Sequence, residues 1–334
     1  MDFSVALCTF NGEKFIEEQL LSILNQSYPV SEIVISDDGS SDRTIEIINS
    51  IIGGLAPDSP TIKVFQNNLP LGIAANFQRC ISLTTSRWIF LCDQDDVWDL
   101  EKVQYFRDLI LQNPGKSFLC SDALLVDSER KSLGYTLLGS LKVRSKERRL
   151  ACGSKAFDVF LKRNIATGAT VVLNRHLFER SHPFPTGWIH DEWLAIVSSM
   201  NGDLFQSDKV TIEYRQHSSN SIGEKKQTLR RRISKYREPR NERNEHLAQR
   251  ARELQEYVVR HKSDYTLAQF EYLHQTAGMF LEFHLKRLKL SPSRPFRLIP
   301  VTRLFFAGEY SRYSRGIKDA IKDLIQPDHE HTGN

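Results

Sequence analysis

The chain has 334 residues, of which 40% are hydrophobic and 26% charged, and its formal net charge is +4. These values are ordinary for a folded globular protein and argue against a disordered or fibrous chain. No apolar run approaches the roughly 20 residues that span a bilayer, and a strand-like run begins at Phe3. We therefore expect neither a membrane-spanning helix nor a signal peptide.

Strand-like and helical segments alternate over the first ninety residues. Apolar runs with the length of strands are found at residues 3–8, 33–36, 62–66 and 88–92. Helical periodicity follows the first three of them, at residues 14–25, up to about 52, and 74–83. The repetition of strand–loop–helix units predicts an α/β fold with a mainly parallel central sheet and helices on both faces.

The run at residues 88–92 leads directly into Asp93-Gln94-Asp95-Asp96. Carboxylates packed this closely repel one another, and a divalent cation allows them to stay ionised. Oxygen ligands on an open loop suit Mg²⁺ or Mn²⁺, which also bridge to phosphates. The alternative is an acidic turn that caps the following helix.

The loops after the first two strands carry polar groups that suit a nucleotide. Thr9 and Asn11 offer a hydroxyl and an amide, Phe10 offers an aromatic face, and Asp38 could accept a hydrogen bond from a base imide. Neither a G-x-G-x-x-G turn nor a G-x-x-x-x-G-K-[ST] loop is present. Binding of phosphate is therefore expected to depend on a metal.

Four motifs in order resemble the inverting family 2 glycosyltransferases of the GT-A fold. They are T-F-N-G-E at 9–13, S-D-D-G-S-S-D at 36–42, L-G-I-A-A-N at 71–76 and D-Q-D-D-V-W at 93–98. The resemblance extends over about residues 3–220 and implies a nucleoside-diphosphate sugar donor. The donor-binding residues that it implies are Thr9, Phe10, Asn11, Glu13, Asp38, Gly72, Asn76 and Asp93. It also implies that Asp95, together with Asp93, holds Mn²⁺ or Mg²⁺ on the diphosphate.

The second half of this domain is expected to supply the acceptor side. Residues 117–126 look like another central strand, and residues 128–150 read as a mobile loop near the acceptor or, equally, a solvated connection. Gly168 lies in a turn of small residues before a further strand. In the family, a turn of this kind lines the sugar pocket, because small residues let the backbone approach a ligand. A simple glycine bulge would leave the same pattern.

The segment G-W-I-H-D-E-W at 187–193 precedes a helix at 194–200. A carboxylate there can be a plain helix-dipole partner. The resemblance instead implies that Asp191 is the catalytic base, with Glu192 as the fallback and His190 replacing a common Glu. Trp188 and Trp193 could stack on a sugar, and one of them is expected in the core. We therefore assign Gly168, Trp188 and Glu192 to the acceptor and sugar pocket.

A strand at 209–214 ends in Arg215-Gln216-His217. A lone histidine is usually structural or exposed, but the family often uses one here at the metal or diphosphate site, so we assign His217 as a metal ligand. Arg215 could contact phosphate or form a surface ion pair.

The rest of the chain predicts a basic helical extension. Between residues 225 and 262 there are thirteen Lys or Arg and five Glu, which gives +8 and leaves about −4 elsewhere. Apolar stripes indicate two packed helices before a break at 291–295 and a short helix at 314–325. We predict a catalytic domain at 1–222 and an extension at 223–334. Residues 225–243 could lie on an anionic membrane or form a solvated helix face; nucleic acid is not expected, because no recognition module is present.

Five cysteines without C-x-x-C spacing indicate free thiols and a cytoplasmic location, with the possibility of peripheral attachment to a membrane. D-Q-D-D-V-W with H-D-E-W and Y-R-Q-H resembles bacterial rhamnosyltransferase-like enzymes that build surface polysaccharide on glycan or lipid-linked acceptors. Two alternatives remain at this point. Asp93 could be the nucleophile of a haloacid-dehalogenase-like phosphohydrolase, although three strand units precede it. The chain could also be an inactive scaffold docked on membranes.

Overall fold

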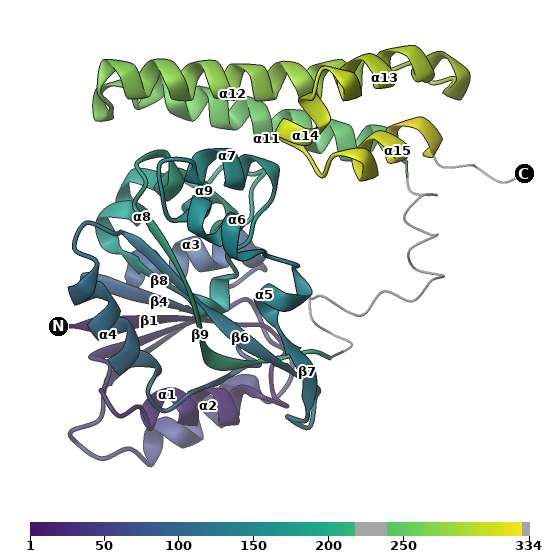
Figure 1. Ribbon diagram of the computed structural model, residues 1–334. Helices are drawn as coiled ribbons and strands as arrows, with labels where there is room; N and C mark the ends of the chain where they lie inside the picture. Colours follow the sequence, from purple (N-terminus) through teal and green to yellow (C-terminus); the bar gives the residue numbers. More distant parts are fainter. Residues whose placement is uncertain (218–238, 329–334) are drawn as a thin grey trace, which may run out of the picture. The chain divides into compact units, whose positions relative to one another are not determined.

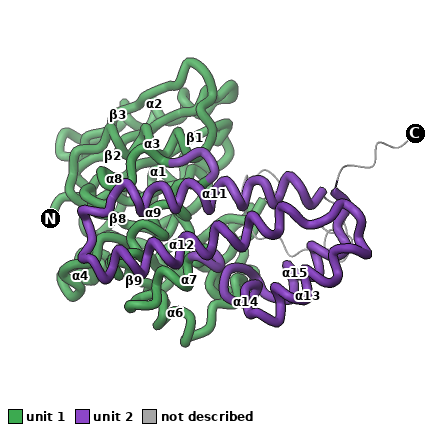
Figure 2. Tube along the Cα trace, turned by 90° about the horizontal axis from the view of Figure 1, so that it is seen from above, with its two compact units in different colours: residues 1–160, 164–184, 188–224 green, residues 161–163, 185–187, 225–334 purple. Residues whose placement is uncertain are grey.

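The computed structural model describes residues 1–217 and 239–328 (Figure 1). The chain divides into two compact units (Figure 2). Unit 1 contains residues 1–160, 164–184 and 188–224, and unit 2 contains residues 161–163, 185–187 and 225–334. Within the described ranges, no helix combines the length and the apolar character needed to cross a bilayer.

One sheet forms the centre of unit 1, with the strand order β3-β2-β1-β4-β8-β6-β9-β5, and β7 pairs with β6. The strands are β1 Phe3–Thr9, β2 Glu32–Asp37, β3 Thr61–Gln66, β4 Trp88–Cys92, β5 Val97–Trp98, β6 Phe118–Val126, β7 Ser132–Thr136, β8 Val171–Asn174 and β9 Leu204–Arg215. The first four strands are parallel, as are β6 and β9. Strand β8 lies antiparallel between β4 and β6, a direction that the sequence did not indicate.

Helices cover both faces of this sheet, which confirms the predicted α/β architecture (Figure 1). Alternate side chains of β1 point to opposite faces. Phe3, Val5 and Leu7 belong to a core shared with α1 Ile16–Leu24, α2 Thr44–Gly53 and α4 Lys102–Gln112. Helices α3 Ile73–Leu83 and α9 His190–Met200 lie on the other face. Strands β1 and β4 are buried along their whole length, which explains their continuous apolar sequence.

The prediction of a loop or solvated connection at residues 128–150 is wrong for most of that range. Residues Ser132–Thr136 form β7, which pairs antiparallel with β6, and two short helices follow, α5 Leu137–Ser140 and α6 Ser145–Ala151. The carboxylate of Asp127 accepts hydrogen bonds from two backbone N–H groups of the connecting turn. The edge of β6 provides backbone hydrogen bonds that local composition does not reveal.

The chain returns to the sheet through short elements: α7 Ala156–Lys162, the 3₁₀ turn η1 Gly168–Thr170, and α8 Arg175–Ser181. Helix α9 begins at His190, so Asp191 and Glu192 lie in its first turn as predicted.

Unit 2 is helical. The long helices α11 Arg240–Arg260 and α12 Leu267–Leu288 lie alongside each other (Figure 2), and the predicted apolar positions Ala251, Leu254 and Leu273 are buried between helices. After them come η3 Arg294–Arg297, α13 Leu298–Phe306, α14 Glu309–Tyr313 and α15 Ile317–Ile325. Helix α13 was not predicted, and the expected helix at 314–325 begins at Ile317 instead.

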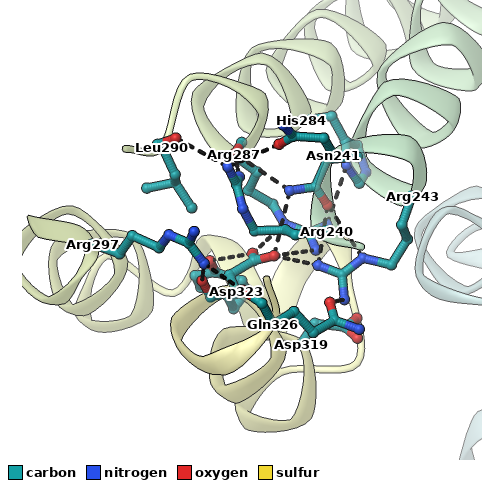
Figure 3. A network of polar contacts seen from close by, with 12 residues as sticks. Arg240, Asn241, Arg243, His284, Arg287, Leu290, Arg297, Asp319, Asp323 and Gln326 are labelled. Atoms are coloured by element: carbon teal, nitrogen blue, oxygen red, sulfur yellow. Dashed lines mark hydrogen bonds and ion pairs between the residues drawn. The ribbon is translucent and has the colours of Figure 1, made fainter. Parts of the chain in front are cut away.

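A buried ionic network joins the helices of unit 2 (Figure 3). Asp323, which is fully buried, accepts hydrogen bonds from Arg243, Arg287 and the hydroxyl of Tyr310. Arg297 is also fully buried and donates to the backbone oxygens of residues 291, 292, 323 and 326. Arg297 thereby binds the carbonyl end of α15, and the buried Arg240 donates to the carbonyl oxygens of Arg287 and Leu290 at the end of α12.

Most of the basic segment at 225–243 lies outside the described residues, so its expected contact with a membrane stays a prediction.

Candidate active site

The polar loops predicted to bind a ligand leave the same edge of the sheet. Strands β2, β1 and β4 are adjacent and parallel. Their register sets Thr9 opposite Asp37, and Leu7 opposite Cys92. The segments that follow these strands therefore begin side by side (Figure 1), where open α/β sheets bind ligands.

Two hydrogen bonds join the first of these loops to the acidic segment. The side chain of Gln94 accepts from the backbone N–H of Phe10 at 2.8 Å and donates to the carbonyl oxygen of Phe10 at 2.9 Å. The ring of Phe10 is half-exposed. Thr9 is buried, and its hydroxyl donates to the carboxylate of Asp37 at 2.8 Å. Phe10 thus presents a free aromatic face, whereas Thr9 supports the next strand.

Asn11 and Glu13 join the first loop to the loop after β2. The Asn11 amide oxygen accepts from the backbone N–H of Ser41 at 2.9 Å, and the Glu13 carboxylate accepts from the N–H of Arg43 at 3.1 Å. Asn11 has a positive φ of 49°, a conformation that asparagine tolerates better than most residues. These two predicted donor residues therefore shape the edge of the site through the backbone.

Asp38 and Asn76 hold a third loop. The Asp38 carboxylate accepts from the backbone N–H groups of Leu71 and Gly72 at 2.7 and 2.9 Å. Asn76 is buried on α3, and its amide exchanges hydrogen bonds with both the hydroxyl and the carbonyl of Ser36. Gly72 has a φ of +81°, and a Cβ there would meet no atom within 4 Å.

Three acidic side chains come close together beyond β4. Burial, followed by the charges of Asp95 and Asp191, raises the pKa of the Asp93 carboxyl to about 7. Burial, followed by the charges of Asp95 and Asp93, raises the pKa of Asp96 well above its usual range. One Asp96 oxygen accepts from the backbone N–H of Arg215 at 3.1 Å, and the other is buried without a hydrogen-bond partner. The segment holds more negative charge than its surroundings neutralise.

His217 reaches this cluster from the end of β9. Its Nε2 lies 2.7 Å from Oδ2 of Asp95, and its ring packs on Phe15 at a centroid distance of 4.7 Å. A cavity of about 550 Å³ opens beside the pair, lined by Lys14, Phe15, Glu18, Ser128, Glu129, Arg215 and His217.

The donor set fits a hard divalent cation. Two carboxylates and an imidazole suit Mn²⁺ or Mg²⁺, and the mutual repulsion that raises the pKa of Asp93 is what a dication would relieve. Within residues 1–217 and 239–328, no three such side chains form a preassembled metal site. The side chains present are therefore chemically suited to a divalent metal.

Asp191 faces this acidic cluster from the first turn of α9. Its Oδ2 accepts from the backbone N–H of Gly168 at 3.0 Å, and its Oδ1 accepts from the N–H of Glu192 at 2.7 Å. A Cβ on Gly168 would come within 2.9 Å of the His190 ring. The absence of a side chain at Gly168 therefore lets its backbone reach Asp191. His190 stacks on Phe77 at 3.8 Å, and burial lowers its pKa to about 3, so the ring is neutral.

The two tryptophans of this segment pack on each other, with ring centroids 5.4 Å apart. Trp193 is fully buried and donates to the carbonyl of Ser181, so it is the core member of the pair. Trp188 is 5% exposed and offers little surface to a sugar in this conformation. Glu192 is half-buried beside Asp191.

Two residues that were not predicted from the sequence, Gln94 and Lys102, also contribute to the site. Gln94 joins two loops, as described above. Lys102 is fully buried on α4; its Nζ donates to the carbonyl of Ala169 at 2.8 Å and lies 4.0 Å from the ring centroid of Trp98. Burial lowers its pKa to about 7, against the opposing pull of Cys92, Asp96 and Asp93.

Arg215 is also buried, and the ion pair considered from the sequence is present, formed by the buried Arg215 with the half-exposed Glu18. Its guanidinium binds the Glu18 carboxylate and the carbonyl oxygens of Asp95 and Ser128. The sequence shows that Lys102 follows the acidic segment closely, but it does not show that the side chain of Lys102 is buried.

Comparison with known proteins finds glycosyltransferases among the sequences and structures similar to this chain. Residues 4–162 match the model of the family described as glycosyl transferase family 2. The chain is 28% identical over 236 residues to dTDP-rhamnosyl transferase RfbG of Shigella flexneri, covering 65% of this chain and 73% of that one. It is 25% identical over 233 residues to UDP-Glc:alpha-D-GlcNAc-diphosphoundecaprenol beta-1,3-glucosyltransferase WfgD of Escherichia coli, covering 68% and 82%. Nothing in these findings supports a phosphohydrolase or an inactive scaffold.

The fold is also that of solved glycosyltransferases. A crystal structure of S. aureus TarS in complex with UDP-GlcNAc superposes with a TM-score of 0.57 at 16% identity, over 97% of this chain and 90% of that one. Mannosyltransferase PcManGT from Pyrobaculum calidifontis, in complex with GDP-Man and Mn²⁺, gives a TM-score of 0.52 at 17% identity, over 92% and 75%. Residues 4–162 thus match the glycosyl transferase family 2 model, and the chain is a glycosyltransferase with the GT-A fold.

Proposed function

We propose that the chain moves a sugar, L-rhamnose or a hexose, from a nucleoside-diphosphate donor to a hydroxyl of a glycan or lipid-linked glycan, with inversion, in bacterial surface polysaccharide synthesis. The observation that carries this proposal is the convergence of Asp191 on the acids after β4, since the charge of Asp191 acts on Asp93 directly. The names of the Shigella flexneri and Escherichia coli relatives support rhamnosyl or glucosyl transfer and a diphosphoundecaprenol-linked acceptor.

Asp191 is the proposed general base. Inverting transfer needs one group that removes the acceptor hydroxyl proton as the oxygen attacks the anomeric carbon, and such a base typically contributes ~10²–10⁴-fold. The N–H groups of Gly168 and Glu192 each donate to one oxygen of Asp191. These two hydrogen bonds fix the orientation of the Asp191 carboxylate, which must be ionised to act as the base. Glu192 remains the alternative base.

Asp93, Asp95 and His217 would hold Mn²⁺ or Mg²⁺. The ion, when bound, would supply Lewis-acid stabilisation to the departing nucleoside diphosphate. The charge of Asp93 and the orientation of His217 toward Asp95 are the contributions of this chain's own residues.

The donor nucleotide is proposed to bind over the loops after β1, β2 and β3. Phe10 supplies an exposed ring for the base, and the open space at Gly72 leaves room for the ligand. Thr9, Asn11, Glu13, Asp38 and Asn76 fix these loops through the hydrogen bonds described above. Gly168 and Trp188 remain the proposed wall of the acceptor and sugar pocket, with Trp188 requiring a side-chain movement to contact a sugar.

A catalytic domain at 1–222, a reducing cytoplasmic location and peripheral contact with a membrane complete the proposal. The five cysteines are free and four of them are buried, which is consistent with a reducing compartment. A diphospholipid-linked acceptor would require the enzyme to work at a membrane surface.

The proposal is tested by thermal-shift screening of nucleoside diphosphates and their sugars, with and without Mn²⁺, followed by measurement of nucleoside diphosphate release. Ligands that bind the folded state raise the midpoint. Asp191→Asn should keep the Mn²⁺-dependent shift and lose transfer by ~10²–10⁴-fold. Asp58→Asn, an exposed change in the connection between α2 and β3, before β3 rather than after a strand end that forms the site, is the control. Transfer by Asp191→Asn at the wild-type rate would exclude Asp191 as the base.

A further inference from the structure

Large apolar side chains are exposed unusually often at one end of unit 2. Of eighteen such side chains in the described residues, seven lie between Phe296 and Ile325. They are Phe296, Leu298, Ile299, Phe306, Ile317, Ile321 and Ile325, with exposed fractions from 40% to 85%. Single exposed apolar residues are normal, but a concentration of them over neighbouring elements marks an interaction surface.

Helix α13 is apolar on both faces. Val301 and Leu304 are buried against unit 2, whereas Leu298, Ile299 and Phe306 point outward and are exposed by 56%, 64% and 85%. A helix that only needed to cover a core would carry polar residues on its outer face, and a helix that is apolar all round is normally covered on both sides.

Helix α15 carries a second apolar stripe with basic residues beside it. Ile317, Ile321 and Ile325 follow the i, i+4, i+8 spacing, so they line one face, and all three are exposed. Lys318 and Lys322 lie three positions before Ile321 and Ile325, so each lysine neighbours the stripe. The buried positions Ala320 and Asp323 lie on the opposite side. Helices α13 and α15 contact each other and lie side by side (Figure 2), so their exposed apolar side chains belong to adjacent elements.

The charge of this region is strongly positive. From residue 289 to residue 325 the chain carries eight Lys or Arg and three Asp or Glu, or +5. Arg297 and Asp323 are buried and cancel, so the +5 belongs to the side chains that are not fully buried. Apolar side chains interspersed with Lys and Arg are suited to an interface of hydrocarbon and anionic headgroups.

We infer that α13 and α15, with Phe296, form the surface by which this enzyme attaches to a bilayer rich in anionic lipid. Phe296, Leu298, Ile299 and Phe306 enter the acyl boundary, and Arg303 and Lys318 contact headgroup phosphates. A second copy of the chain is a poorer occupant, because a two-fold interface would set each basic patch against its own copy. This surface differs from the 225–243 segment expected from the sequence. It concerns the proposed lipid-linked acceptor but is tested without donor or acceptor.

The test is co-sedimentation of the full chain with vesicles of phosphatidylcholine alone and with vesicles in which about a third of the lipid is phosphatidylglycerol, which makes the vesicle surface negative. The wild type should bind the anionic vesicles and not the neutral ones. Ile299→Glu/Phe306→Glu should weaken that binding by at least about tenfold, because it removes two large apolar groups and adds two negative charges. Arg303→Glu/Lys318→Glu should reduce binding and abolish its sensitivity to salt.

The matched control is Leu111→Glu/Leu267→Glu, which changes two leucines exposed by 58% and 68% outside this region and should bind like the wild type. Circular dichroism and the thermal midpoint verify that each variant is folded. The inference is overturned if the wild type binds neither vesicle, or if Ile299→Glu/Phe306→Glu binds as well as the wild type. It is equally overturned if that variant instead converts a wild-type dimer to a monomer, which would identify a second copy as the occupant.

Discussion

The Nε2 atom of His217 lies 2.7 Å from Oδ2 of Asp95, although 122 residues separate them in the chain. Strand β9 runs back through the sheet to bring the histidine to the acidic segment after β4, and Arg215 secures that approach by donating from Nε to the carbonyl oxygen of Asp95. The two side chains proposed to share a metal are thus positioned by the same backbone connection.

We expect His217→Ala and Asp95→Ala each to weaken Mn²⁺-dependent binding of nucleoside diphosphate by tenfold or more, because each removes a proposed ligand. The measurement is the thermal shift with nucleoside diphosphate as Mn²⁺ is titrated. His176→Ala, an exposed histidine on α8, is the control. If the dependence of the thermal shift on Mn²⁺ were unchanged in both variants, His217 and Asp95 would not be metal ligands.

The contact between Gly12 and Gln94 gives a second expectation. A Cβ on Gly12 would lie 2.2 Å from the Gln94 amide oxygen, which binds the backbone of Phe10. Gly12→Ala should therefore release Gln94 from Phe10. With each neutral hydrogen bond worth about 1 kcal/mol, loss of both should lower donor affinity on the order of tenfold.

The double variant Gly12→Ala/Gln94→Ala should bind donor no more weakly than either single variant, since both changes break the same two hydrogen bonds. Gly53→Ala is the matched control, because a Cβ there meets no atom within 4 Å. Additive losses in calorimetric titrations of donor would show that Gly12 acts by some other route.

Lys102 predicts a dependence of stability on pH. Burial lowers its pKa to about 7, whereas an unfolded lysine keeps its proton to about pH 10.4. Between these values the unfolded chain binds more protons than the folded one, so the free energy of unfolding should rise with pH by up to about 1.4 kcal/mol per unit from this group. Asp93 has the opposite sign: its pKa is raised to about 7, so its contribution falls as pH rises through the acid range up to 7.

The measurement is urea unfolding in EDTA at pH 7.5, 8.5 and 9.5. The free energy of unfolding should rise more steeply with pH for the wild type than for Lys102→Met. Lys209→Met, at an exposed lysine, should follow the wild type. The interpretation fails if the profiles of wild type and Lys102→Met are parallel.

Asp323 is the central acid of the unit 2 network. Burial raises the pKa of its carboxyl, but the charge and hydrogen bonds of Arg287 outweigh burial and hold the pKa below the usual range. Asp323→Asn leaves the buried Arg287 without its counter-charge and should cost about 3–5 kcal/mol of stability. In the wild type this contribution should be lost as the pH falls through the depressed pKa of Asp323.

The measurement is urea unfolding monitored by helical circular dichroism. Asp319→Asn on the same helix is the control; its carboxylate is only partly buried and should matter by less than about 1 kcal/mol. Equal effects of the two substitutions would mean that the network contributes little.

Much of the fold was accessible from the sequence, because its early strands are buried on both faces and carry continuous apolar runs. Trp88–Cys92 is a strand with the predicted bounds, and Asp191 lies in a first helical turn as expected. The residues at 128–150 were misread because β7 depends on hydrogen bonds to β6, and local polarity does not reveal a partner strand. The antiparallel direction of β8 was missed for the same reason, because it depends on pairing with β4 and β6.

By itself the sequence determined the resemblance to family 2 glycosyltransferases, the order of the strand–helix units and the acidic, histidine and Asp191 candidates, because these depend on local periodicity and on residue identity at fixed spacing. Only the tertiary structure decided that Asp38 and Asn76 brace loops, that Lys102 is buried beneath the acids, and that α13 and α15 expose apolar faces. Burial and hydrogen-bond partners depend on residues far away along the chain, and a local pattern contains no record of which side chains the fold brings together.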